Sequence, residues 1–78
     1  MNTYTGAELD LVIMSGNSRL GFEFKRTVAP RLTRSIHVAM QDLKLSQVYI
    51  INAGNDVYPL APNVTALGLS QIVTQLKE

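Results

Sequence analysis

The sequence predicts a mixed α/β fold, an α+β arrangement whose single sheet combines antiparallel and parallel strands in the order β-β-α-β-β-α. Three observations support this class. Apolar and polar residues alternate strictly along residues 7–25, which is typical of a β-hairpin. Apolar residues then recur at helical spacing over about residues 30–43. Residues 47–52 are apolar on both alternating faces, as in a central strand that is covered above and below.

The predicted hairpin turns at Gly16-Asn17, a pair that favours a tight connection between two strands. We expect the strands at about residues 7–14 and 19–25. With a two-residue loop, the polar residues of both strands share one face and the apolar residues share the other. The apolar positions are Leu9, Leu11, Ile13, Leu20, Phe22 and Phe24.

The polar face of this hairpin carries two acids in an unfavourable place. The register puts Asp10 opposite Glu23, and Glu8 opposite Lys25. Two carboxylates about 5 Å apart repel by on the order of 3 kcal/mol at an effective dielectric of about 20. Either a cation bridges the pair, one acid holds a proton, or Lys25 and Arg19 weaken the repulsion in solvent.

The helix over about residues 30–43 begins at Pro30, which suits a first helical turn. It connects strand 19–25 to strand 47–52, and a right-handed crossover makes these two strands parallel. We expect the helix to cover the apolar face of the hairpin and to leave the carboxylate face partly open. The two surfaces in contact would be Leu32, Ile36 and Met40 on the helix and Leu20, Phe22 and Phe24 on the strand.

The last third of the chain predicts a turn, a short strand and a closing helix. Residues 53–56 have turn composition. Residues 58–62 contain two prolines, which lack N–H donors, so this segment is not a central strand. A strand is expected at about residues 64–69, and Ser70 is the predicted N-cap of a helix over about residues 71–77.

Length and composition narrow the function classes. The 78 residues indicate one small domain, residues 1–78, and a hydrophobic fraction of 46% excludes disorder. No apolar run approaches the ~20 residues of a membrane span, so we expect no membrane association. The absence of cysteine excludes disulfides and thiolate zinc sites, and it fits a cytoplasmic location.

The acids on the hairpin are the first candidate for chemistry. Asp10 and Glu23 supply the hard oxygen ligands that magnesium or manganese prefers, and Lys25 lies two residues beyond Glu23. A metal-polarised water beside a lysine is suited to attack on a phosphodiester. The alternative is a solvated strand face with a Glu8–Lys25 ion pair.

The second candidate is a group of basic residues. Although the net charge is only +1, five of the seven lysines and arginines fall within 16 positions. Arg26, Arg31 and Arg34 lie near the expected start of the helix, where phosphate oxygens are attracted. They are therefore candidate contacts to a nucleic-acid backbone, with ordinary solvated arginines as the alternative.

The pattern Asp10…Glu23-x-Lys25, on a hairpin followed by a helix and a strand, resembles the PD-(D/E)XK, or restriction-endonuclease-like, nuclease fold. More closely, residues 4–70 resemble the C-terminal domain of a family of bacterial and archaeal P-loop ATPases of the AAA+ class. The segments that carry this resemblance are Gly6-Ala7-Glu8-x-Asp10, Glu23-x-Lys25-Arg26, Ala29-Pro30-Arg31 and Tyr58-Pro59-Leu60.

The resemblance implies roles for single residues. Those matching Asp10 and Glu23 bind the metal, the one matching Lys25 assists the attacking water, and Glu8 matches an auxiliary acidic position. Two departures count against activity. The helix and strand that open the nuclease core are missing, and no P-loop motif occurs, so no nucleotide is expected. The chain therefore resembles a freestanding, truncated form, for which a separate ATPase is a candidate partner.

Two classes of function remain open at this point. The first is a nuclease-like domain that binds magnesium or manganese and contacts or cleaves a nucleic-acid backbone. The second is a noncatalytic, vestigial domain that acts only in association. The sheet edge near residues 7–14 would be open, and an open edge invites pairing with another copy, so we expect a homodimer.

Overall fold

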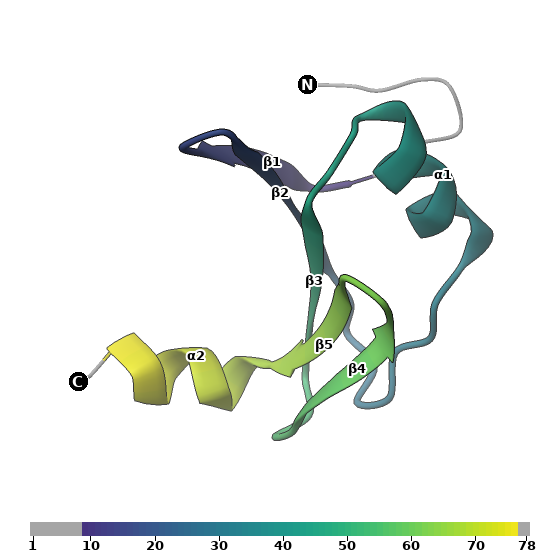
Figure 1. Cartoon of the computed structure of the whole chain (residues 1–78). Coiled ribbons are helices and arrows are strands. Elements are labelled where there is room, and N and C mark those ends of the chain that lie inside the picture. The colour runs from purple at the N-terminus through teal and green to yellow at the C-terminus, as the bar shows by residue number, and fades with distance from the viewer. Residues whose placement is uncertain (1–8, 77–78) are drawn as a thin grey trace.

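The computed structural model describes residues 9–76, which form a mixed five-stranded sheet with two helices (Figure 1). This confirms the predicted α+β class. The elements in chain order are β1 (Leu11–Ser15), β2 (Ser18–Phe24), α1 (Arg34–Asp42), β3 (Gln47–Asn52), β4 (Val57–Ala61), β5 (Val64–Gly68) and α2 (Leu69–Leu76).

The strands lie in the order β1-β2-β3-β5-β4. β1 and β2 form the predicted hairpin, in which Ser15 pairs with Ser18 across a Gly16-Asn17 loop. Gly16 has a φ of 63°, a conformation that glycine adopts without steric cost. β2 runs parallel to β3, as the crossover predicted, and β3 runs parallel to β5. β3 is therefore the central strand, and Val48 and Ile50 within it are fully buried.

The helix α1 lies on the other face of the sheet from the one predicted. Ile36 packs with Val48, Ile50 and Val64 in the buried core. The β2–β3 register places Val48 beside Gly21 and Ile50 beside Glu23, so this is the face of the hairpin's acids. Leu20, Phe22 and Phe24 alternate with Gly21 and Glu23 and therefore lie on the opposite face from α1, and Phe24 is 55% exposed.

The reason for this difference lies in β3. Alternation along the hairpin distinguishes two faces but does not say which one a helix covers. β3 is apolar on both faces. Its fully buried side chains Val48 and Ile50 form a continuous apolar surface against which α1 packs. Gly21 leaves space on this face for the side chains of Leu45 and Leu9. A Cβ at position 21 would lie only 2.8 Å from Leu45 Cδ1 and 2.9 Å from Leu9 Cδ1.

α1 also begins later than predicted. Thr33 is its N-cap, with extended backbone and a side-chain oxygen that accepts a hydrogen bond from Ile36 N–H at 3.3 Å. A threonine hydroxyl satisfies a free N–H of the first turn, which proline at position 30 cannot do. Pro30 is buried before the helix, and Leu32, predicted to join the apolar stripe, is exposed instead.

The C-terminal third contains one strand that the sequence did not predict. β4 pairs antiparallel with β5 and contains Pro59, where the register is irregular. As an edge strand it tolerates a residue without an N–H donor, so the exclusion of this segment from the sheet's centre agrees with the structure. α2 begins at Leu69, directly after β5, and Ser70 lies inside the helix rather than at its N-cap.

The turn at residues 53–56 forms hydrogen bonds to β3, β5 and α2. Gly68 N–H donates to Asp56 O at 2.9 Å, and Gln71 Nε2 donates to Asn55 O at 2.9 Å. Asn52 is buried, but its amide is satisfied by Ile50 O and by the N–H of Gly54. The backbone at Gly54 lies so close to Gly68 that a side chain at position 68 would collide with Gly54 O.

We predict that Gly68→Ala lowers the free energy of unfolding by about 3 kcal/mol, because backbone atoms cannot move aside as a flexible side chain can. Urea unfolding measures this loss. Gly16→Ala is the matched comparison: its new Cβ meets nothing within 4 Å, and only the positive φ opposes it, at about 1 kcal/mol. A loss at position 68 no larger than that at position 16 would contradict the close approach.

Candidate metal and phosphate site

Glu23 is the centre of the candidate site. It lies near the end of β2, beside the fully buried Ile50 of β3, and its side chain is only 13% exposed. Lys25, two residues on, places its Nζ atom 3.2 Å from Glu23 Oε2 and is 41% exposed. The Glu23 carboxylate is therefore shielded from water, whereas the Lys25 ammonium is more exposed. The ion pair partly neutralises the charge of Glu23.

Asp10 approaches from the neighbouring chain segment, just before β1. Its N–H donates to Phe22 O at 3.0 Å, one residue out of the Leu11–Phe22 register, so the regular ladder ends at Leu11. Its Oδ2 atom accepts a hydrogen bond from Phe24 N–H at 2.7 Å. The Asp10 side chain therefore satisfies a backbone donor on β2 where no strand residue of β1 remains opposite, and it holds its carboxylate next to Glu23.

The two acids influence one another. The pKa of Glu23 is raised above its ordinary value, first by burial and then by the negative charge of Asp10 and by hydrogen bonding to it. The ion pair with Lys25 opposes this rise without cancelling it. Of the outcomes that the sequence left open, the ion pair with Lys25 weakens the repulsion between the acids, and the raised pKa of Glu23 is a shift in the direction of proton binding.

The donor set suits a hydrated ion better than an all-protein cage. Among residues 9–76, no cluster of three or more acids or histidines could hold a metal. Magnesium, however, is commonly held by one or two carboxylates while water and substrate phosphates fill its other positions. Asp10 and Glu23 meet that requirement. Glu8, the predicted auxiliary acid, lies outside the described residues.

The predicted phosphate contacts separate into two groups. Arg26 follows Lys25 directly and is exposed beside the site. Arg31 lies in the connection to α1, and Arg34 is the first residue of that helix; both are exposed. Within the described part of the chain, no hydrogen bond or ion pair joins Arg31 or Arg34 to Asp10 or Glu23. All three arginine side chains are exposed and therefore accessible to an external anion.

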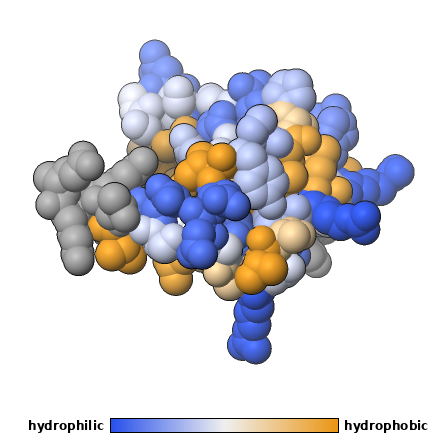
Figure 2. Space-filling model, turned by 90° about the horizontal axis from the view of Figure 1, so that it is seen from below, coloured by the Kyte–Doolittle hydropathy of each residue, from blue (hydrophilic) through white to orange (hydrophobic). Residues whose placement is uncertain are grey.

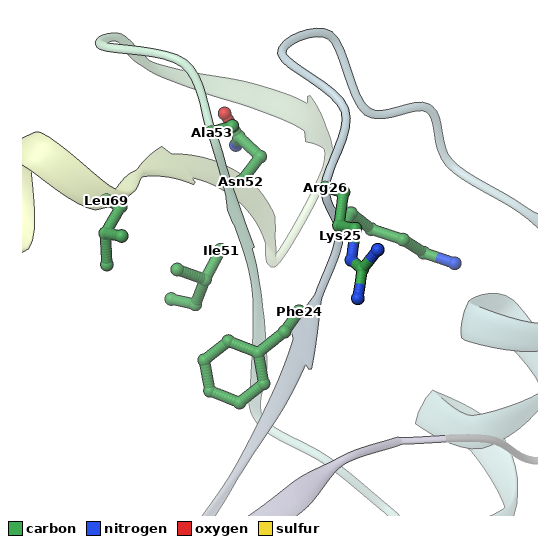
Figure 3. A pocket seen from close by; sticks show the side chains of 7 residues that line it. All are labelled: Phe24, Lys25, Arg26, Ile51, Asn52, Ala53 and Leu69. Carbon is green, nitrogen blue, oxygen red and sulfur yellow. The ribbon is translucent and has the colours of Figure 1, made fainter.

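A hollow of about 370 Å³ opens at the ends of β2 and β3, and reasoning from the sequence missed it. Figure 3 shows Phe24, Ile51 and Leu69 on the side of the sheet away from α1, while the Lys25 side chain extends toward α1. Arg26, Asn52 and Ala53 complete the lining. The only signal in the sequence was that parallel strands tend to place ligand sites at their carboxyl ends.

Together, the fold and site define a small α+β domain with a paired-carboxylate hairpin flanked by basic residues. The chain belongs to the family described as Domain of unknown function (DUF4143), whose model matches residues 1–72. This family is known as an ATPase-associated domain, so that part of the resemblance is confirmed.

Two curated relatives are similar to most of the chain. An uncharacterized protein of Mycobacterium bovis and one of Mycobacterium tuberculosis are each 39% identical over 72 residues, which cover 92% of the chain. The match spans only 16% of the length of either relative. No solved structure matches the chain. No helix within the described range is both long and apolar enough to cross a membrane.

We predict that Glu23→Gln changes how stability depends on pH. A carboxyl whose pKa is higher in the folded than in the unfolded chain binds its proton more tightly when folded. Its contribution to stability is therefore complete below the unfolded pKa and declines as pH rises through the folded pKa. The Gln variant should lack this decline, so its melting temperature should exceed that of the wild type more at neutral than at acidic pH.

Thermal unfolding between about pH 3 and pH 8 tests this difference, since those limits lie below the ordinary carboxyl pKa values and above neutrality. Asp56→Asn is the matched control, because it removes one exposed carboxylate outside the site. Parallel melting curves for the wild type and Glu23→Gln at every pH would show that Glu23 titrates as it does in the unfolded chain.

Proposed function

We propose that this domain binds a divalent cation, magnesium or manganese, through Asp10 and Glu23, and contacts a nucleic-acid backbone in a nuclease-like manner. The observation that carries this proposal is the convergence of three groups. Asp10 and Glu23 interact across neighbouring segments, and the Lys25 amine lies 3.2 Å from the Glu23 carboxylate. The restriction-endonuclease-like kinship belongs to the same proposal.

The residues have distinct parts in this site. Glu23, shielded by the sheet, offers a carboxylate whose charge is poorly compensated, which favours an incoming cation. Asp10 offers the oxygen that is not engaged by Phe24 N–H. When bound, a divalent cation supplies Lewis acidity toward a phosphate oxygen or a water molecule. Lys25, released from Glu23, would then orient that water or neutralise a phosphate.

The basic residues extend the site toward a polyanion. Arg26 is adjacent to Lys25 and exposed, while Arg31 precedes α1 and Arg34 is its first residue. Arginine makes bidentate contacts to phosphate oxygens, and such contacts position a nucleic acid without reading its sequence. The proposal therefore expects binding that weakens with salt and varies little with base sequence.

Calorimetric titration of the full chain with magnesium or manganese tests cation binding. We expect binding that strengthens with pH and releases protons, because the ion requires an ionised Glu23 and lowers its pKa. The released protons appear as a heat that depends on the ionisation enthalpy of the buffer. Glu23→Gln should reduce affinity by at least about 10-fold, the cost of losing one of two charged ligands.

The variants Asp10→Asn and Asp10→Ala separate the two roles of Asp10, which are the hydrogen bond from Phe24 N–H and the proposed binding of the cation. The asparagine keeps an oxygen for Phe24 N–H, so it should fold like the wild type yet lose the ion. The alanine should also unfold more readily, by about 1 kcal/mol for the lost hydrogen bond. Unchanged ion binding in Asp10→Asn and Glu23→Gln, or no binding by the wild type, would end the proposal.

A second candidate function is noncatalytic association. It is favoured by the internal partners of the site: Asp10 accepts a hydrogen bond from a backbone N–H, and Lys25 forms an ion pair with Glu23. In that case the hairpin acids are structural and the domain serves to hold partners together. A separate ATPase would be a suitable partner for such a domain, since the family is ATPase-associated.

A further inference from the structure

The strand β1 presents an unusual surface. Leu11, Val12, Ile13 and Met14 follow one another along it, and each is between 41% and 60% exposed. No charged residue and no proline interrupts Leu11–Ser15. Edge strands are normally protected by lysine, proline or a bulge, so a bare apolar edge indicates a partner.

The main chain of β1 is also free on one side. β1 ends the sheet order, and no strand in the described range pairs with its outer edge. Ser15 and Ser18 flank a two-residue loop, where the closing pair is hydrogen-bonded. Alternate residues, Ile13 and Leu11, then also bond to β2. The N–H and C=O groups of Val12 and Met14 therefore point outward.

The opposite edge of the sheet differs. β4 contains Pro59, which lacks an N–H, and its register with β5 shifts between Pro59 and Ala61. A head-to-tail contact of β1 with β4 from another copy is therefore disfavoured. Figure 2, which views the molecule from below, shows hydrophobic and hydrophilic groups interspersed over that face. The β1 edge is thus the better site for self-association.

We propose that β1 pairs antiparallel with β1 of a second copy, which joins the two sheets into one. Centring the pair on Ile13 sets Val12 beside Met14 of the second copy, and the outward groups of both residues then bond mutually. The contact is isologous, because the same strand is used twice, so assembly closes at a dimer. Side chains on both faces of β1 become buried at the seam.

The charges agree with this register. Asp10 falls beyond the paired segment, opposite Gly16 of the second copy, so no acid meets an acid across the seam. A five-residue strand buries less than the ~1,200 Å² of a standard interface. The dimer should therefore dissociate on dilution within the micromolar range rather than be permanent.

Sedimentation velocity of the full chain over a range of concentrations tests the proposal. The wild type should pass from monomer to dimer as concentration rises. Met14→Lys places a charge in the seam, at a side chain already 60% exposed in the monomer, and should weaken association at least 10-fold. Val57→Lys, on the opposite edge strand β4, is the matched control and should associate like the wild type.

A second variant tests the main chain itself. Val12→Pro removes an outward N–H that the hairpin does not use, so it should also weaken association, with circular dichroism confirming that each variant is folded. A wild type that stays monomeric, a Met14→Lys variant that associates like the wild type, or species that grow beyond a dimer would overturn the proposal. None of these outcomes bears on cation binding, which Met14→Lys should retain.

Discussion

The parallel pairing of β2 with β3 is the constraint on which the rest of the structure depends. It requires the chain to leave β2, cross one face of the sheet as α1 and return beside its starting strand. Because the crossover has a preferred hand, the helix has one side available once the strand directions are set. That side holds Val48 and Ile50, and the core forms there with Ile36.

This placement changes the character of the acidic hairpin. Had α1 covered Phe22 and Phe24, Glu23 would face solvent and its charge would be screened. Instead Glu23 shares its face with the core and lies beside Ile50, which no solvent reaches. Burial is accordingly the largest cause of its raised pKa. The apolar side of the hairpin is left open, where Phe22 stacks on Tyr49 with ring centroids 5.5 Å apart.

The site also illustrates how one residue serves both fold and function. Asp10 continues the hairpin with a side-chain oxygen where the strand has ended, and the same bond aims its carboxylate at Glu23. Because the fold itself needs Asp10, its presence alone is poor evidence for a catalytic role. For this reason the conservative asparagine variant says more about the ion than the alanine variant does.

Local pattern alone determined the hairpin, its register from Leu11 to Phe22 and the parallel crossover, because period-2 alternation and the Gly16-Asn17 turn act between neighbours in the chain; Leu9, expected on the apolar face, instead packs against the core beside Gly21. Local pattern also placed Asp10, Glu23 and Lys25 together for that reason. Only the tertiary structure decided which sheet face α1 covers, that Thr33 rather than Pro30 starts it, and that residues 57–61 form an edge strand. These outcomes depend on long-range packing and strand order, which no local periodicity encodes.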